Sequence, residues 1–153
     1  MAAERAYVTD MSPLMTAEEL LQTNIPNKRT ELVRGRLIVR EPAGYSHGRV
    51  TMNLTVRLGA HVESAGCGQL VAAETGFTLV VEVLSPDDRP GETLAKVGDW
   101  LEAGARLAWV IDPQRRLARI YRPDGTESLL AESDALDGED VLPGFNCPLA
   151  AIL

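Results

Sequence analysis

The chain has 153 residues, of which 45% are hydrophobic and 24% are charged, and its net charge is −7. This length and composition fit one globular domain, and they exclude a membrane-spanning helix because no apolar run approaches about 20 residues. The negative charge disfavours tight sequence-independent binding to nucleic acid, which depends on lysine and arginine meeting phosphates. It still permits a site where a divalent cation supplies the positive charge.

The start of the chain and its two cysteines indicate a cellular compartment. The first residues contain no apolar signal segment, so a secretory signal is not expected. Cys67 and Cys147 belong to no CxxC motif and no Cys/His cluster, which favours free thiols in a reducing compartment over a disulfide. We therefore expect a cytoplasmic protein without a membrane partner.

The N-terminal region begins with an arm and a short helix. Residues 1–15 are expected to form a flexible arm, and residues 16–153 a single domain. Thr16 and Glu19 have the spacing of a capping box, which predicts a helix of about two turns before Pro26.

Two short strands and a long helix are expected next. The stretch 31–40 alternates as two strands around Arg34-Gly35, which is typical of a hairpin. Ser46 is a candidate N-cap for a helix reaching Ser64, with a buried stripe that recurs every fourth residue. That stripe consists of Val50, Leu54, Leu58 and Val62. In the first turn of this helix, His47 is interpreted as a hydrogen-bonded helix-start residue rather than a ligand.

The centre of the chain combines a strand, an acidic turn and a helix. Strands are expected over 69–73 and over Gly76–Ser85, where no turn residue interrupts the second run. Glu82 is the one charge in that apolar run. A buried carboxylate costs several kcal/mol unless it is compensated, so Glu82 is either paired or functional. Pro90 suits the first position of the following helix, which carries Lys96.

The predicted helix has its own buried stripe, and the rest of the chain is expected to be rich in strands. Leu94, Val97 and Leu101 recur at helical spacing before Gly104. Strands are predicted over 107–111, 117–122 and 127–130, followed by an acidic loop over 134–140 and an apolar tail over 149–153 packed on the core. The four arginines between 115 and 122 are interpreted as a solvated hairpin face.

Several stretches together resemble a known family. They include T-A-E-E-L-L, R-T-E-L-V-R-G-R-L, S-H-G-R-V, V-V-E-V-L-S-P-D-D-R, K-V-x-x-W-L-x-A-G, L-A-W-V-I-D-P, Y-R-P-D-G and V-L-P-G-F. In their order and number they resemble the Uma-type restriction endonuclease family of the PD-(D/E)XK nuclease-like superfamily, from about Met15 onward. The resemblance implies a restriction-endonuclease-like α/β fold, with a mixed sheet of about four or five strands flanked by helices.

The resemblance also implies roles for individual residues. It implies that Glu82 is a catalytic acid and metal ligand, that Lys96 is the displaced catalytic lysine, and that Glu31 is a further site residue. His47 matches the family's helix-start histidine. The implied chemistry uses Mg²⁺ held by carboxylates to activate a water and to neutralise charge on the phosphate, while a lysine orients the nucleophile.

One part of the family pattern is missing from this chain. The family's first acid lies in a P-D-[VL]-x-[FV] strand, but here Leu79 directly precedes Val80. The resemblance thus implies that a few tens of residues are absent, either through an internal deletion in the gene or because a segment is missing from the sequence. Glu74, Asp87 and Asp88 are candidate replacements, and their spacing selects none of them.

Two hypotheses of function follow. The first is an endonuclease that hydrolyses phosphodiesters, with weakly held Mg²⁺, DNA favoured over RNA, a homodimeric state and activity impaired by the missing strand. The second is a non-catalytic nuclease-fold module for binding or assembly. The structural alternatives are a buried pair of Glu82 with Lys96, a helix pair of Lys96 with Glu92 or Asp99, and a strand-edge charge at Glu31. We predict that Glu82 and Lys96 lie within a few Å of each other or of one shared pocket.

Overall fold

The computed structural model describes residues 13–71 and 78–153. The arm expected over 1–15 therefore lies almost wholly outside the described residues. The chain divides after Ala43 into two compact units, and the single domain expected over 16–153 stays a prediction. Among the described residues, none of the helices has the length and apolar character needed to cross a membrane.

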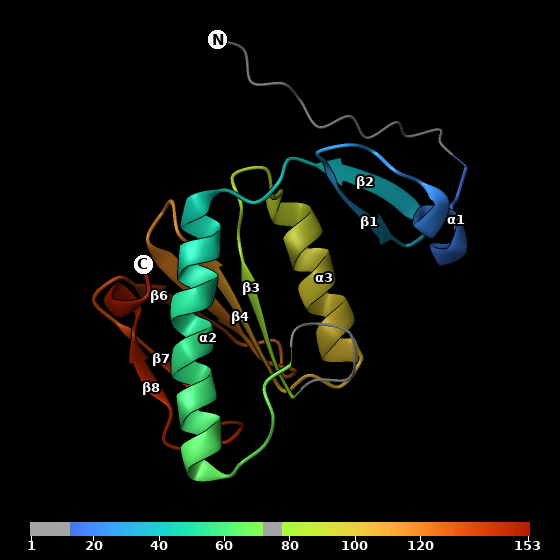
Figure 1. Cartoon of the computed structure of the whole chain (residues 1–153). Helices are drawn as coiled ribbons and strands as arrows, with labels where there is room; N and C mark the ends of the chain where they lie inside the picture. Colours follow the sequence, from blue (N-terminus) through green and yellow to red (C-terminus); the bar gives the residue numbers. More distant parts are fainter. Residues whose placement is uncertain (1–12, 72–77) are drawn as a thin grey trace. The chain divides into compact units, whose positions relative to one another are not determined.

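The first unit contains a short helix and a β-hairpin (Figure 1). Its elements are α1 (Ala17–Gln22), β1 (Arg29–Val33) and β2 (Arg36–Arg40). The predicted capping box is present, because Thr16 Oγ1 accepts from the Glu19 N–H at 3.2 Å and the Glu19 carboxylate accepts from the Thr16 N–H at 2.8 Å. Arg34 and Gly35 both adopt left-handed φ values, 51° and 77°, which confirms the predicted tight turn between antiparallel strands.

The second unit is built on a four-stranded mixed sheet. Its elements are α2 (Tyr45–Ala65), β3 (Leu79–Val83), α3 (Pro90–Glu102), β4 (Leu107–Asp112), β5 (Leu117–Tyr121), β6 (Glu127–Ala131), β7 (Ala135–Asp137), β8 (Asn146–Pro148) and the 3₁₀ helix η1 (Leu149–Ala151). The order is β3-β4-β5-β6, with β3 and β4 parallel and the other neighbours antiparallel. Helices α2 and α3 flank the sheet (Figure 1). The predicted α/β class is therefore confirmed.

The two faces of β4 enter two separate hydrophobic clusters, because side chains alternate along a strand. The larger cluster lies under α2 and includes Leu107, Trp109 and Ile111 of β4. The smaller cluster lies under α3 and includes Ala108 and Val110 of β4. The stripe predicted for α2 is confirmed, with Val50, Leu54 and Leu58 buried and Val62 partly buried.

The C-terminal tail packs on the core and is tied to α2. Leu149 and Ile152 are fully buried, as predicted for the tail. Three side chains one helical turn apart donate to three consecutive backbone carbonyls of the tail. These bonds run from Arg49 to Leu153, from Asn53 to Ile152 at 3.3 Å, and from Arg57 to Ala151 at 3.4 Å.

Some predicted boundaries are wrong. Residues 69–71 form no strand, and residues 72–77 lie outside the described residues. The strand expected over Gly76–Ser85 covers only Leu79–Val83 in the described part, since Thr78 is a bend and Leu84 leaves the strand two residues before Pro86. It nevertheless passes through the junction between Leu79 and Val80 without a loop.

Three further expectations were wrong in detail. The N-cap of α2 is Gly44 rather than Ser46. Leu94 is 57% exposed and so lies outside the buried stripe of α3, where Val97 is the buried residue. The segment predicted as an acidic loop contains β7, which pairs with β8.

Candidate functional site

Glu82 and Lys96 face each other between β3 and α3. On β3, Leu79, Val81 and Val83 belong to the cluster under α2, so the alternating Glu82 points toward the α3 side. Glu82 Oε1 lies 3.6 Å from Lys96 Nζ, and the two side chains are 24% and 18% exposed. The predicted proximity is confirmed, and the arrangement is a partly buried ion pair.

The turn between β3 and α3 fixes the spacing of that pair. One carboxylate oxygen of Asp88 accepts from the Ser85 N–H at 2.7 Å and from the Ser85 hydroxyl at 3.0 Å. Pro90 then occupies the start of α3, where its missing N–H has no cost. Asp88 is one of the candidate replacement acids, and its carboxylate has a structural role in this turn.

Glu31 is placed in the other unit, on β1. Its Oε1 accepts from Arg40 Nε at 3.2 Å, and the Arg40 side chain is almost fully buried. This pairing across the β1–β2 hairpin is a structural role for Glu31. The structure describes it within its own unit only, so a role beside Glu82 stays a prediction.

His47 lies in the first turn of α2, as expected. Its Nδ1 is buried and has no hydrogen-bond partner among the residues that the structure describes. The interpretation as a hydrogen-bonded helix-start residue therefore gains no support at that atom.

The described residues of one chain do not form a metal centre. Over 13–71 and 78–153, no group of three or more His, Cys, Asp or Glu side chains is arranged to hold a metal ion. Glu82 supplies one carboxylate at the β3–α3 site. Glu74, the third candidate replacement acid, lies outside the described residues.

The arginines on β5 and in the turn before it are paired with acids. Arg116 is paired with Glu132 and Arg119 with Glu127. The hydrogen bond to Glu132 raises the pKa of Arg116, and the reciprocal bond lowers the pKa of Glu132. The expectation of a simple solvated face was therefore incomplete, because each of these guanidinium groups has a specific carboxylate partner.

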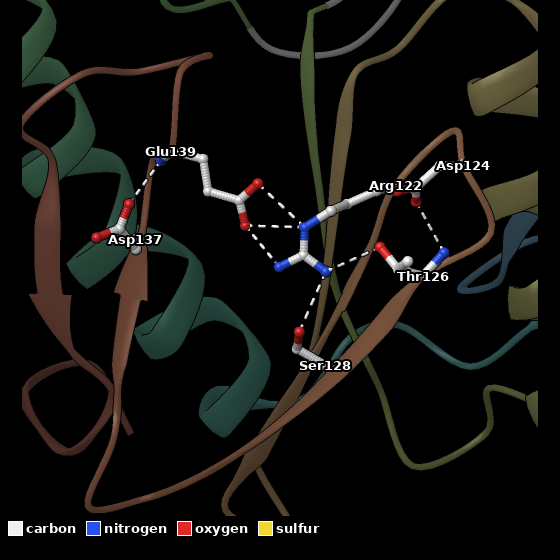
Figure 2. Close-up of polar contacts among 6 residues, drawn as sticks. All are labelled: Arg122, Asp124, Thr126, Ser128, Asp137 and Glu139. Carbon is white, nitrogen blue, oxygen red and sulfur yellow. Dashed lines mark hydrogen bonds and ion pairs between the residues drawn. The ribbon is translucent and has the colours of Figure 1, made fainter.

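Arg122 is less exposed than Arg116 and Arg119, and its guanidinium group contacts several polar side chains (Figure 2). Its Nε lies 3.0 Å from both carboxylate oxygens of Glu139, its Nη2 lies 2.6 Å from Glu139 Oε1, and its Nη1 donates to Ser128 Oγ at 3.1 Å. The hydrogen bonds to Glu139 raise the pKa of Arg122. Asp137 in turn accepts from the Glu139 N–H at 2.6 Å. This network joins the β5–β6 hairpin to the loop after β7.

Comparisons with known proteins agree with this fold. Residues 77–150 match the Uma2 family model, described as "Putative restriction endonuclease". The chain is also similar to a solved structure titled as a putative nuclease of DUF820 from Anabaena variabilis ATCC 29413. The TM-score is 0.73 at 14% sequence identity, over 90% of this chain and 97% of that chain.

A search of curated proteins finds no match. At 14% identity the solved structure shows a shared fold and nothing finer. That fold is the restriction-endonuclease-like core expected from the sequence, and the family match covers β3, α3 and the rest of the sheet. The family match over residues 77–150 and the shared fold both support the resemblance of this chain to the Uma-type family of restriction-endonuclease-like proteins.

Proposed function

We propose that this protein is a nuclease that hydrolyses phosphodiester bonds of nucleic acid weakly, with DNA favoured over RNA. The observation that carries the proposal is the Glu82–Lys96 pair, which combines a carboxylate and an ammonium at one half-buried position. The match of residues 77–150 to the Uma2 family model supports the assignment. Glu82 and Lys96 are the proposed catalytic residues, and Glu31 is proposed as a further site residue.

Each of the two side chains has a role in this chemistry. The Lys96 ammonium donates hydrogen bonds to a phosphate oxygen and stabilises the negative charge that develops in the transition state. The Glu82 carboxylate lies 3.6 Å from the Lys96 ammonium. It accepts a hydrogen bond from the attacking water and so orients that water toward the phosphorus. Their ion pair orients both groups before the substrate arrives.

Mg²⁺ is the proposed cofactor, and we propose that one chain holds it weakly. The described residues offer it Glu82 and no cluster of three ligands, so this donor set fits a divalent cation poorly. Each 1.4 kcal/mol lost from transition-state stabilisation lowers the rate about tenfold. Weak binding of Mg²⁺ is therefore expected to lower the rate of phosphodiester cleavage.

The charge of the protein also supports weak activity. The net charge is −7, and Arg116, Arg119 and Arg122, on β5 or next to it, are bound to carboxylates. Little long-range attraction is left to concentrate a polyanionic substrate near the pair.

The proposal is tested by nicking of supercoiled plasmid DNA in Mg²⁺ and in Mn²⁺. We expect slow metal-dependent nicking by the wild type, and its loss in Glu82→Ala and Lys96→Ala. The matched control is Glu127→Ala, which removes a carboxylate from an exposed pair on β6. Equal nicking by all four proteins would show that the Glu82–Lys96 pair is not the reactive centre.

The second candidate is a non-catalytic nuclease-fold module, favoured by the lack of a three-ligand cluster in the described residues. Metal binding separates the two functions. Titration with Mn²⁺, followed by the paramagnetic resonance of the free ion, should show binding that depends on Glu82 if the protein is a nuclease. A module for binding or assembly would show no such dependence.

A further inference from the structure

Strand β3 lies at an edge of the four-stranded sheet. In the described part of the chain its one hydrogen-bonded strand neighbour is β4. Leu84 N–H donates to Ile111, and the Thr78 carbonyl accepts from Arg106 and Leu107. Backbone groups alternate in direction along a strand, so the even-numbered residues of β3 face β4. The N–H and C=O groups of Leu79, Val81 and Val83 therefore point away from the sheet.

This edge has few of the features that normally protect an edge strand. Natural edge strands are blunted by lysine, proline, bulges or short length. β3 is L-V-V-E-V, without proline or lysine, and it pairs with β4 in a regular register. Its one charge, Glu82, is balanced by Lys96. The edge is thus a mostly apolar, β-branched template for another strand, and its one charge lies beside an ammonium group.

We propose that β3 pairs antiparallel with β3 of a second copy of this chain, with Val81 opposite its own counterpart. This register places the outward backbone groups of Leu79, Val81 and Val83 against Val83, Val81 and Leu79 of the second copy. It makes about six inter-chain hydrogen bonds. An antiparallel pair of identical strands has two-fold symmetry, which gives a closed dimer instead of a chain of molecules.

Charge and geometry favour a second copy over an unrelated strand. In this register Glu82 lies opposite Val80 of the second copy, and the two Glu82 residues are diagonal neighbours on one sheet face, with Cα atoms about 7–8 Å apart. Each carboxylate brings its own Lys96, so the interface carries two acids and two ammonium groups in balance.

The pairing would also change the candidate site, and this consequence rests on the proposed nuclease function. Among the described residues, Glu82 is the carboxylate printed beside Lys96, and these residues contain no cluster of three metal ligands. Two copies joined through β3 bring two Glu82 carboxylates to the same face. Carboxylate oxygens are the ligands that Mg²⁺ and Mn²⁺ prefer, so the second copy adds a further acid to the carboxylate that the described residues place beside Lys96.

Proline substitutions on the two edges of the sheet test the interface. Val81→Pro removes an N–H that points away from β4, and so blocks pairing with a second copy while sparing the β3–β4 bonds. The matched control is Leu129→Pro on β6, the opposite edge. Arg122 N–H donates to the Thr126 carbonyl, so in the β5–β6 register the Leu129 N–H also points outward.

Sedimentation velocity of the full chain is the measurement. We expect a dimer for the wild type and for Leu129→Pro, and a monomer for Val81→Pro. A monomeric wild type, a dimeric Val81→Pro, or a dimer lost only in Leu129→Pro would overturn the proposal.

Amide hydrogen exchange of the wild type gives a second test that does not depend on the folding of a variant. The Val81 and Val83 N–H groups should exchange slowly at high protein concentration and faster on dilution. Rapid exchange at every concentration would overturn the pairing.

Mn²⁺ titration then separates this inference from the proposed function. We expect one Mn²⁺ per two chains, with binding lost in both Val81→Pro and Glu82→Gln. A monomer that binds Mn²⁺ and cleaves DNA would overturn the pairing and leave the nuclease intact. A β3-linked dimer that binds one Mn²⁺ per two chains but cleaves nothing would support the pairing and contradict the nuclease.

Discussion

Replacement of Lys96 by methionine should destabilise the fold because it leaves Glu82 without its ammonium partner. Methionine keeps most of the apolar stem of lysine, so the packing of α3 on the sheet changes little. The loss is therefore mainly electrostatic. Glu82→Gln removes the carboxylate charge instead, and the double variant removes both charges while keeping similar volumes.

The size of the effect can be worked from the geometry. Two unit charges 3.6 Å apart attract by about 4.5 kcal/mol at an effective dielectric constant near 20. Desolvation of both groups offsets much of this attraction. Exposed pairs contribute about 0–1 kcal/mol, and removal of one partner from a buried pair costs about 3–5 kcal/mol. With about a fifth of each side chain exposed, we expect a loss of about 2 kcal/mol for Lys96→Met and a coupling of about 1 kcal/mol.

The assay is urea unfolding of the wild type, both single variants and the double variant. The exposed pair Arg119–Glu127 provides a matched cycle, for which we expect a coupling below about 0.5 kcal/mol. A Glu82–Lys96 coupling no larger than that of the exposed pair would refute the reasoning that half-burial strengthens this interaction.

Further predictions concern other parts of the second unit. Arg122→Lys loses the bidentate contact with Glu139 and should lower the free energy of unfolding by about 1 kcal/mol in urea titrations; no change would show that the network contributes only locally. Cys67 is exposed, whereas Cys147 is buried and burial raises the pKa of its thiol. A thiol reagent should therefore label one cysteine in the native protein and two after unfolding. Burial also raises the pKa of Tyr121 above its usual value near 10. The stability linked to this group is complete below that value and declines as pH rises through the folded pKa, and Tyr121→Phe should remove this decline from alkaline unfolding curves.

The strand–turn–helix unit could be predicted because its signals are local. An apolar β-branched run ends at Ser85-Pro86, and Pro90 marks the start of a helix. The proximity of Glu82 and Lys96 followed from one physical requirement, since a carboxylate inside an apolar strand needs compensation. The structure supplies that compensation from the next element in the chain.

The features that could not be predicted from the sequence depend on residues far apart in the chain. β7 has three residues and exists through its pairing with β8, so the acidic composition around it outweighed any strand signal. Arg122 and Glu139 are brought together by the return of the chain after β6, and no periodicity links them. The strand predicted over 69–73 shows the opposite error, because Leu70 and Val71 are exposed and belong to no strand in the described part of the chain. β propensity produces a strand only where a neighbour is available.

Cleavage of an end-labelled DNA duplex under single-turnover conditions tests the central claim most directly. The protein is held in excess in Mn²⁺, and wild type is compared with Glu82→Gln and with the matched variant Glu127→Gln. The account predicts slow metal-dependent cleavage that Glu82→Gln lowers at least about tenfold, the equivalent of about 1.4 kcal/mol, and that Glu127→Gln leaves unchanged. Cleavage that is unaffected by Glu82→Gln, or an absence of metal-dependent cleavage in the wild type, would contradict it.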